Sequence, residues 1–299
     1  MCYALPSDSY GSAALRLPLP HSPDADAAPR LTPPAQRPYP LPALEDEGAD
    51  APELLRLDGV AHPALGGERD VIVALPPAAA RVAGRRFRVV YMQDGQNLFD
   101  PDTSFAGDWQ LGPTLAHHAR LGRHVIVVAV SNGGPRRITE YTPFEDPVRG
   151  GGGAADYLAF LTETLKPLVD RRFPTLPGRE FTAIAGSSLG GLLSAYAHFR
   201  RPDIFGASAV LSPALWFADG AIHGYISDAA AVGGRIYLDV GIEEGPDEVA
   251  DVRRLRNQLV ARGYRLDDTL RYVEEEGADH HESRWAARFR EALPFLLGT

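Results

Sequence analysis

Apolar runs alternate with helical stretches along most of this 299-residue chain. The run Val125–Val130 is apolar throughout, as expected of a strand that is buried on both faces. Strands separated by helices imply parallel crossovers, so the pattern predicts an α/β fold: a mostly parallel central sheet of about eight strands with helices on both faces. The strands are expected at Leu54–Leu57, Arg69–Leu75, Arg86–Gln93, His124–Ser131, Phe181–Ser187, Gly206–Leu211, Arg235–Val240 and Thr269–Glu275. The helices are expected at about 109–121, 156–172, 189–200, 246–262 and 282–297.

Three stretches depart from this alternation. Prolines recur through residues 1–50 without a period of 2 or 3.6, which predicts a Pro-rich N-terminal arm, partly disordered or acting as a lid or dimer arm, before one folded domain at 51–299. The two strands before Gln93 are joined by a short Pro/Gly-rich link, which predicts an antiparallel start to the sheet. Residues 132–155 are rich in Gly and Pro and predict a long loop of the kind that shapes binding sites.

Composition narrows the class of protein. The chain is 44% hydrophobic and 23% charged, which is ordinary for a soluble globular protein. Its net charge is -9 and it has no long basic run, so neither nucleic acid nor an anionic membrane is an expected partner. Cys2 is the only cysteine, which excludes a disulfide framework within one chain. With neither a secretory signal pattern nor an apolar run of about 18 residues, the sequence predicts a cytoplasmic protein.

The most informative motif is Gly186-Ser187-Ser188-Leu189-Gly190, which reads G-x-S-x-G. Strand formers precede it and a helix-forming run follows it. Strand, tight turn and helix form the context of a nucleophile elbow, in which small residues let a sharp turn lift the serine hydroxyl to the end of the sheet. We therefore predict Ser188 as a nucleophile. The alternative is a Gly/Ser turn that only lets the helix pack closely on the sheet.

A serine nucleophile needs an imidazole as general base, and the imidazole benefits from a carboxylate that orients it. In this architecture the acid and then the histidine follow the serine along the chain. Glu243 and Glu244 lie on the loop after the strand at 235–240, and Asp239 lies within that strand. We favour Glu244 as the acid and leave Glu243 and Asp239 open; the remaining acids would stabilise the start of the next helix.

The general base is expected near the C-terminus. His280 and His281 follow the last predicted strand, and the loop Gly277-Ala278-Asp279 would deliver an imidazole to the end of the sheet. We favour His280. A histidine pair also raises the possibility of a metal site, but such a site needs three or more converging ligands and no H-E-x-x-H spacing occurs, so we expect neither metal nor cofactor.

An oxyanion hole needs two N–H donors. One is expected from Leu189, the residue after the nucleophile. The other is expected from the loop Asp94-Gly95-Gln96, where Gly95 permits a turn that aims the Gln96 amide inward. The alternative for this loop is a turn closed by an Asx-type hydrogen bond.

Aromatic and cationic side chains near these loops are candidates for substrate contact. We predict aromatic walls from Trp109, Trp216 and Tyr141, with core packing as the alternative for each. Arg137, in the Gly-rich loop, is a candidate for binding an acidic substrate group, with a solvated loop face as its alternative.

Four segments together resemble the putative esterase family of α/β-hydrolases, a group that includes enterochelin-type and feruloyl esterases. They are Asp94-Gly95-Gln96-Asn97-Leu98-Phe99, Glu140-Tyr141-Thr142-Pro143, Ala185-Gly186-Ser187-Ser188-Leu189-Gly190-Gly191 and Gly277-Ala278-Asp279-His280-His281-Glu282-x-x-Trp285. The likeness runs from about residue 55 to 297 and is to the enterochelin-esterase-like branch. It implies an α/β-hydrolase fold with Ser188 as nucleophile, Glu244 as acid and His280 as base, and a substrate choice that lies in the loops.

The sequence therefore predicts a serine carboxylic ester hydrolase that acts on a small-molecule ester through an acyl-enzyme intermediate. Two alternatives stay open: an acyltransferase on the same scaffold, and a non-catalytic binding protein with the same fold. The presence of Ser188, His280 and nearby acids argues against the second. The sequence does not fix the acyl and alcohol parts of the substrate, and it leaves a homo-oligomer open.

Overall fold

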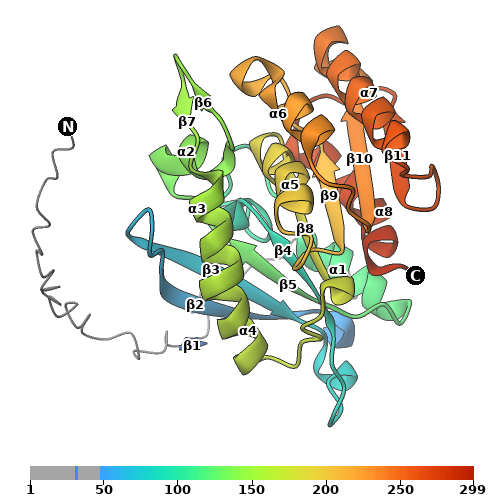
Figure 1. Ribbon diagram of the computed structural model, residues 1–299. Helices are drawn as coiled ribbons and strands as arrows, with labels where there is room; N and C mark the ends of the chain where they lie inside the picture. The colour runs from blue at the N-terminus through green and yellow to red at the C-terminus, as the bar shows by residue number, and fades with distance from the viewer. Residues whose placement is uncertain (1–30, 33–47) are drawn as a thin grey trace, which may run out of the picture.

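The computed structural model describes residues 31–32 and 48–299. Its main sheet has nine strands in the order β1-β2-β3-β5-β4-β8-β9-β10-β11 (Figure 1). Their bounds are β1 Leu31–Thr32, β2 Glu53–Ala61, β3 Glu68–Leu75, β4 Arg88–Met92, β5 Val125–Val130, β8 Thr182–Ser187, β9 Ala207–Leu211, β10 Arg235–Gly241 and β11 Leu270–Glu275. A small second sheet pairs β6 (Glu145–Asp146) with β7 (Gly150–Gly151). Each of the eight strands expected from the sequence is present.

The sheet starts antiparallel and continues parallel. β2 pairs antiparallel with β3, and β3 pairs antiparallel with β5. From β5 through β4, β8, β9 and β10 to β11 every neighbour is parallel. The predicted antiparallel start and mostly parallel sheet are confirmed. The parallel part matters for function because it brings many strand ends to one edge.

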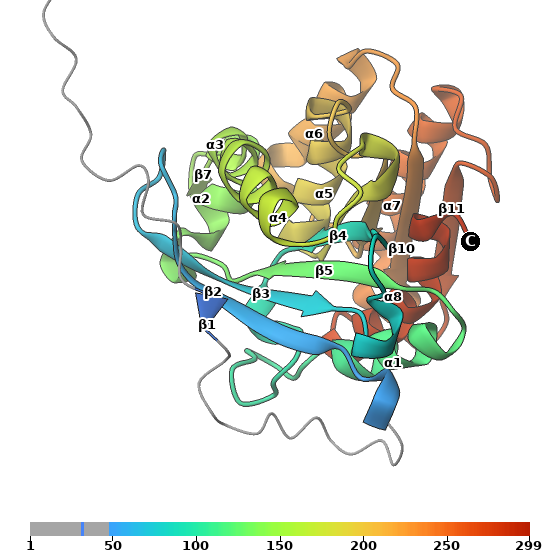
Figure 2. The same cartoon turned by 90° about the horizontal axis from the view of Figure 1, so that it is seen from below.

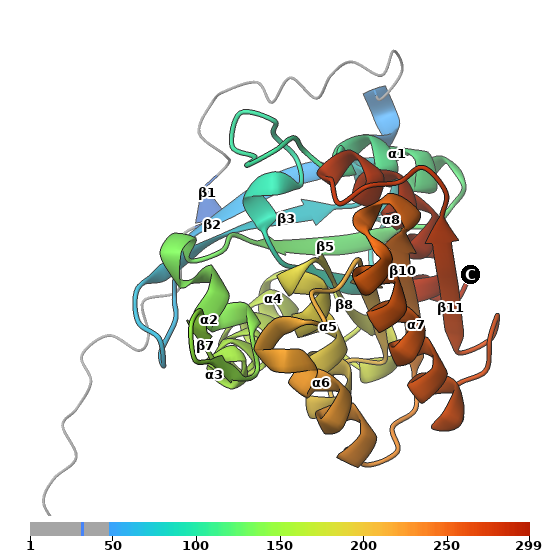
Figure 3. The ribbon, with the colours of Figure 1, turned by 90° about the horizontal axis from the view of Figure 1, so that it is seen from above.

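Helices cover both faces of the sheet (Figures 2 and 3). α1 (Leu111–Arg120) and α8 (Glu282–Leu297) lie on one face. The other face carries α3 (Ala154–Ala159), α4 (Lys166–Arg172), α5 (Leu189–Arg200), α6 (Phe217–Asp228) and α7 (Pro246–Ala261). A short helix, α2 (Arg137–Tyr141), interrupts the predicted long loop.

Two helical details differ from the sequence expectation. The helix expected at 156–172 consists of α3, a π-helical stretch at Phe160–Leu165, and α4. Pro167 lies in the first turn of α4 and lacks an N–H, so an unbroken α-helical ladder is not available there. α6 was not expected, because glycines dilute its pattern and Ala218, Asp219 and Gly220 have positive φ.

The core has two layers, one on each face of the sheet. β5 lies between them and all six of its residues are buried. Ile126, Val128 and Val130 join the cluster beneath α3 to α7, whereas the alternate residues of the strand pack toward α1 and α8. This period of two explains why a strand buried on both faces reads as one continuous apolar run.

Most of the predicted N-terminal arm at 1–50 lies outside the described residues. Within that range, Leu31–Thr32 forms β1 and pairs antiparallel with β2, so it adds a strand to the edge of the sheet. Gly48–Asp50 forms a short 3-10 helix. In the part of the chain that the structure describes, no helix has both the length and the apolar character needed to cross a bilayer.

Candidate active site

The carboxyl ends of the parallel strands lie at one edge of the sheet, and the candidate residues follow these ends. Gln96 follows β4, Ser188 follows β8, Glu244 follows β10 and His280 follows β11. The crevice outside the carboxyl ends of the strands is the usual ligand site of α/β sheets. The fold therefore gathers residues that are far apart in the sequence.

Ser188 occupies a strained turn between β8 and α5. Its φ of 56° and ψ of -120° are unusual for a residue with a side chain. A Cβ at Gly186 would overlap Gln93 Oε1, and one at Gly191 would lie 2.6 Å from the Leu211 carbonyl oxygen. Glycine at these two positions lets the strand, turn and helix pack together, which is the geometry expected of a nucleophile elbow.

The backbone of Ser188 is fixed from several directions. Its N–H donates to the Leu211 carbonyl at 3.0 Å, and its carbonyl accepts from the N–H groups of Leu192 and Ala214, both at 3.0 Å. The strain at this residue is therefore held by β9 and by the first turn of α5. Ser188 is half-buried and lines a cavity of about 860 Å³ at the edge of the sheet.

His280 lines the same cavity and is hydrogen-bonded to Glu244. The distance between His280 Nδ1 and Glu244 Oε2 is 2.8 Å. The imidazole is 42% exposed, whereas the carboxylate is 1% exposed. A carboxylate on Nδ1 selects the tautomer that keeps Nε2 as an acceptor. The contacts among the described residues do not include a hydrogen bond between the Ser188 hydroxyl and His280.

Of the three candidate acids, Glu244 is the one that contacts His280. Asp239 is fully buried in β10, where its carboxylate lies 3.2 Å from Nε of Arg288. Glu243 is exposed to solvent. His281 instead caps α8, because its Nδ1 accepts from the Ser283 N–H at 3.2 Å.

The environment of Glu244 favours its charged form. Burial raises its pKa, but hydrogen bonds from His280, the Ser212 hydroxyl and the Gly241 N–H outweigh burial and bring the pKa of Glu244 below its ordinary value. The Gly241 N–H donates at 2.7 Å and the Ser212 hydroxyl at 2.5 Å, both to Oε1. Glu244 is thus a buried carboxylate that stays charged and can accept a hydrogen bond from an imidazole N–H.

The loop after β4 presents the second candidate amide. Asp94 adopts the left-handed conformation, with φ of 53°. A Cβ at Gly95 would lie 2.7 Å from the Ala129 carbonyl carbon, so only glycine allows the turn to pack against β5. Within the described residues, the N–H groups of Gln96 and Leu189 donate no hydrogen bond to the protein. Gln96 also lines the cavity.

Asp94 connects this loop to the loop after β5. Its carboxylate accepts two hydrogen bonds from Arg137, through Nε and Nη2, each at 2.8 Å. Asn132 Nδ2 donates to the same carboxylate at 2.6 Å, and the Asn132 N–H donates to Gln96 Oε1 at 3.2 Å. These bonds hold the Gln96 turn in place from the neighbouring loop.

The predicted aromatic walls need correction. Trp109 is 4% exposed and packs in the core against the rings of Trp285 and Phe289, so its ring cannot reach a ligand. Tyr141 is fully buried, and its hydroxyl accepts from the Asp94 N–H at 3.0 Å. Trp216 is 44% exposed but lies outside the cavity wall, with the Arg149 guanidinium 5.2 Å from its ring centre.

Comparison with known proteins identifies the chain. The family described as Putative esterase matches residues 62–296, which is most of the chain. The chain belongs to this family of esterases. The resemblance inferred from the four motifs is therefore confirmed, and the elbow and the C-terminal histidine segment both lie inside the matched region.

Curated relatives of this esterase include bacterial and fungal proteins. The uncharacterized protein YbbA of Bacillus subtilis is 27% identical over 246 residues, which cover 78% of this chain and 94% of YbbA. The siderophore enterobactin esterase of Emericella nidulans is 31% identical over 171 residues, which cover 50% of this chain and 54% of the relative. The siderophore triacetylfusarinine C esterase of Aspergillus fumigatus is 34% identical over 137 residues, or 43% of this chain and 44% of the relative.

Solved structures confirm the fold of the esterase. The enterobactin esterase of Shigella flexneri, crystallised in the presence of enterobactin, superposes with a TM-score of 0.66 at 19% identity, and covers 84% of this chain and 61% of that one. The BES protein of Bacillus cereus superposes with a TM-score of 0.65 at 21% identity. The superposition covers 81% of this chain and 94% of the BES protein. The esterase has the α/β-hydrolase fold.

Sequence reasoning missed several residues at the site of the esterase. Ser212 and Arg288 both contact Glu244, and Asn132 holds the Gln96 turn. Phe105 is 93% exposed and lines the cavity from the loop that follows Gln96. Ser212 directly follows β9, so its position at a strand end was a usable signal, whereas Arg288 lies inside a helix and its sequence context carries none.

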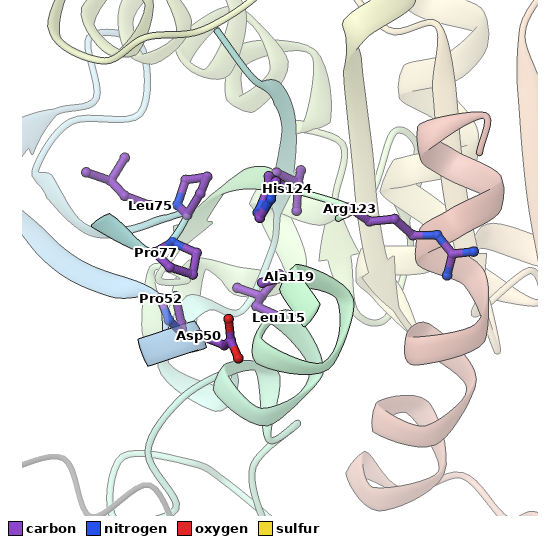
Figure 4. A pocket seen from close by; sticks show the side chains of 10 residues that line it. Asp50, Pro52, Leu75, Pro77, Leu115, Ala119, Arg123 and His124 are labelled. Carbon is purple, nitrogen blue, oxygen red and sulfur yellow. The ribbon is translucent and has the colours of Figure 1, made fainter. Parts of the chain in front are cut away.

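Another hollow lies at the opposite edge of the sheet, near the start of β5 (Figure 4). Asp50 and Pro52 face Leu75, Leu115 and His124 across it. Its volume is about 10 Å³, which is room for one water molecule at most. Among the described residues, no group of three His, Cys, Asp or Glu side chains could hold a metal ion.

Asp239 is expected to make stability fall as the pH rises. Burial, opposed by Arg288, raises the pKa of Asp239 to about 7, so the folded protein binds its proton more tightly than the unfolded chain. The stabilisation is complete below the ordinary pKa and is lost as the pH rises through about 7. As the pH rises from about 4 to 7, wild type should therefore lose stability that Asp239→Asn keeps. The free energy of unfolding of the variant minus that of wild type should increase by up to about 1 kcal/mol per pH unit. Urea unfolding across this range measures it, and a constant difference between the two proteins would contradict it.

Proposed function

We propose that this esterase is a serine carboxylic ester hydrolase with Ser188 as nucleophile, His280 as general base and acid, and Glu244 as the carboxylate that orients His280. The hydrogen bond of 2.8 Å between Glu244 and His280, on the wall of the cavity that Ser188 also lines, carries the proposal. Three further features support it: the strained elbow, the buried charge of Glu244 and the free amides beside the cavity.

In the first half of the reaction Ser188 becomes acylated. Nε2 of His280 accepts the hydroxyl proton while Oγ attacks the carbonyl carbon of the ester. The imidazolium that forms is stabilised by Glu244, and it donates its proton to the alcohol oxygen as the carbon–oxygen bond breaks. The products of this half are the free alcohol and an ester between Ser188 and the acyl group.

In the second half water releases the acid. His280 accepts a proton from a water molecule, which attacks the acyl carbon, and the proton returns to Ser188 Oγ as it leaves. In both halves a negative charge develops on the carbonyl oxygen. We propose that the N–H groups of Leu189 and Gln96 bind this oxygen; the loss of one such donor typically lowers the rate about 100- to 1000-fold.

The cavity presents several polar groups to a substrate. Its walls carry Gln96, Asn97, Thr103, Ser104 and Asn132, beside the apolar surfaces of Phe105 and Trp285. Amides and hydroxyls bind oxygen-rich groups and contribute no apolar contact to a long alkyl chain. The substrates named for the two fungal relatives, triacetylfusarinine C and enterobactin, are therefore the first natural esters to test.

Arg137 contributes to the same wall. Asp94 engages its Nε and Nη2 atoms, and among the described residues Nη1 has no hydrogen-bond partner. We propose that Nη1 binds an oxygen of the substrate. A homo-oligomer and a cytoplasmic location stay predictions from the sequence.

Hydrolysis of p-nitrophenyl acetate, butyrate and octanoate tests the reaction and the shape of the acyl site together. We expect wild type to turn over acetate and butyrate with a kcat/KM at least about tenfold above that for octanoate, because an octanoyl chain would lie against the amides and hydroxyls that share the cavity wall with Phe105 and Trp285. The Ser188→Ala variant should turn over none of them. An octanoate preference would contradict this account of the acyl site, and turnover that persists in Ser188→Ala would contradict the mechanism.

A further inference from the structure

Ser212 lies behind the proposed catalytic residues, and the proposed mechanism gives it no role. It follows β9 directly, is 3% exposed and has a positive φ of 39°. Its Oγ has three hydrogen-bond partners: Glu244 Oε1 at 2.5 Å, Trp285 Nε1 at 3.0 Å and Arg288 Nη2 at 2.7 Å. A buried hydroxyl with three side-chain partners links those side chains into one hydrogen-bond network and does more than pack.

The identities of the partners fix the direction of each hydrogen bond. The indole N–H of Trp285 and the guanidinium of Arg288 can only donate. They occupy the two acceptor positions of the hydroxyl, so its single proton goes to Glu244. Ser212 therefore has one available orientation, and in it Glu244 Oε1 must be an acceptor.

Two members of this network, Glu244 and Trp285, contact His280 from different sides. Glu244 accepts from Nδ1, and the ring of Trp285 meets the imidazole edge to face, with ring centres 4.8 Å apart and planes at 90°. Both of these neighbours of His280 are tied to Ser212 Oγ. Arg288 extends the network to Asp239, whose Oδ1 in turn accepts from the Ser212 N–H at 3.0 Å.

We propose that Ser212 is a positioning residue that holds Glu244 and Trp285 against His280, so that the imidazole keeps its orientation and tautomer through the reaction. This inference rests on the proposed function of Glu244 and His280. Ser212 does not touch the substrate in this scheme; it acts through the two groups that flank the base.

The backbone of Ser212 offers a control for a purely structural role. A positive φ strains serine but suits glycine, so Ser212→Gly removes the hydroxyl and relieves the backbone, whereas Ser212→Ala removes the hydroxyl and keeps the strain. If the hydroxyl is the functional part, both variants should lower kcat for p-nitrophenyl acetate about 10- to 100-fold, with KM changed less than threefold. Normal activity in the glycine variant would overturn the proposal.

A double-mutant cycle with Glu244 tests the route of the effect. If Ser212 acts through Glu244, Ser212→Ala should slow turnover about 10- to 100-fold in wild type but less than threefold in a Glu244→Ala background. The inactivation rate by a fluorophosphonate, which needs the same activated serine, should follow the same cycle. Equal losses in both backgrounds would mean that Ser212 does not act through Glu244, and would overturn the proposal that it positions both Glu244 and Trp285.

The cycle also separates this inference from the function on which it rests. If Glu244→Ala leaves both rates unchanged, the proposed role of Glu244 fails and the role of Ser212 fails with it. If Glu244→Ala slows both rates while Ser212→Ala does not, the proposed function stands and the inference about Ser212 is wrong. Unfolding by urea, measured on each variant, identifies any loss of activity that comes from loss of fold.

Discussion

Replacing Ser188 by alanine is expected to lower ester turnover by at least about 10⁴-fold while the protein stays folded. The hydroxyl oxygen is the only heavy atom removed, and the backbone hydrogen bonds that fix the turn, to Leu211, Leu192 and Ala214, do not depend on it. Initial rates of p-nitrophenyl acetate hydrolysis measure the loss, and urea unfolding checks the fold.

Ser187 supplies the matched control. It is the neighbouring serine, ends β8 and also lines the cavity, but its position precedes the elbow. Ser187→Ala should keep kcat within about tenfold of wild type, because the elbow geometry presents only the residue at the turn. If Ser187→Ala lost as much activity as Ser188→Ala, or if both kept it, the assignment of the nucleophile would be wrong.

Replacing Arg69 by methionine is expected to lower the free energy of unfolding by about 3–5 kcal/mol. Arg69 and Glu140 form an ion pair between β3 and α2, and their side chains are only 2% and 0% exposed. Removing the cation leaves a carboxylate buried without its partner. Glu140 also accepts from the Gly133 N–H at 3.2 Å, next to the asparagine that holds the Gln96 turn, so activity should fall as well.

The double variant Arg69→Met, Glu140→Met shows why the single variant loses stability. It separates the loss of the ion-pair attraction from the cost of leaving the Glu140 charge buried without a partner. Two apolar side chains of similar volume in the same place should recover most of the stability, because desolvation of the ion pair costs nearly as much as the attraction returns. Urea unfolding of the four proteins gives the cycle. Additive losses in the double variant would show that the pair does not act as a unit.

The parallel part of the fold could be predicted because its signals are local. The apolar run of β5 and the helical runs that separate the strands each follow from residues close together in sequence. α6 escaped prediction because its start depends on Ala218, Asp219 and Gly220 adopting positive φ, which the surrounding structure imposes. The π-helical stretch before Pro167 was also not predicted. It depends on how the local helical hydrogen bonds rearrange where proline supplies no N–H.

The candidate site divides in the same way. Ser188, Glu244 and His280 could be named because each follows a strand end in the chain order that this architecture requires. Trp109 and Tyr141 were wrong as cavity walls because the sequence does not show how deeply a side chain is buried. Both lie near the site but beneath its surface. Ser212 and Arg288 were missed because their partners are distant in sequence and meet only after the sheet and α8 have packed.

Mass spectrometry of the protein after reaction with a fluorophosphonate tests the central claim, an activated serine at position 188, most directly. The account predicts one adduct per chain, on the peptide that contains Ser188, present in Ser187→Ala and absent from Ser188→Ala. It also predicts that His280→Ala slows formation of the adduct by at least about 100-fold. A wild-type protein that forms no adduct, or an adduct that persists in Ser188→Ala, would contradict the account.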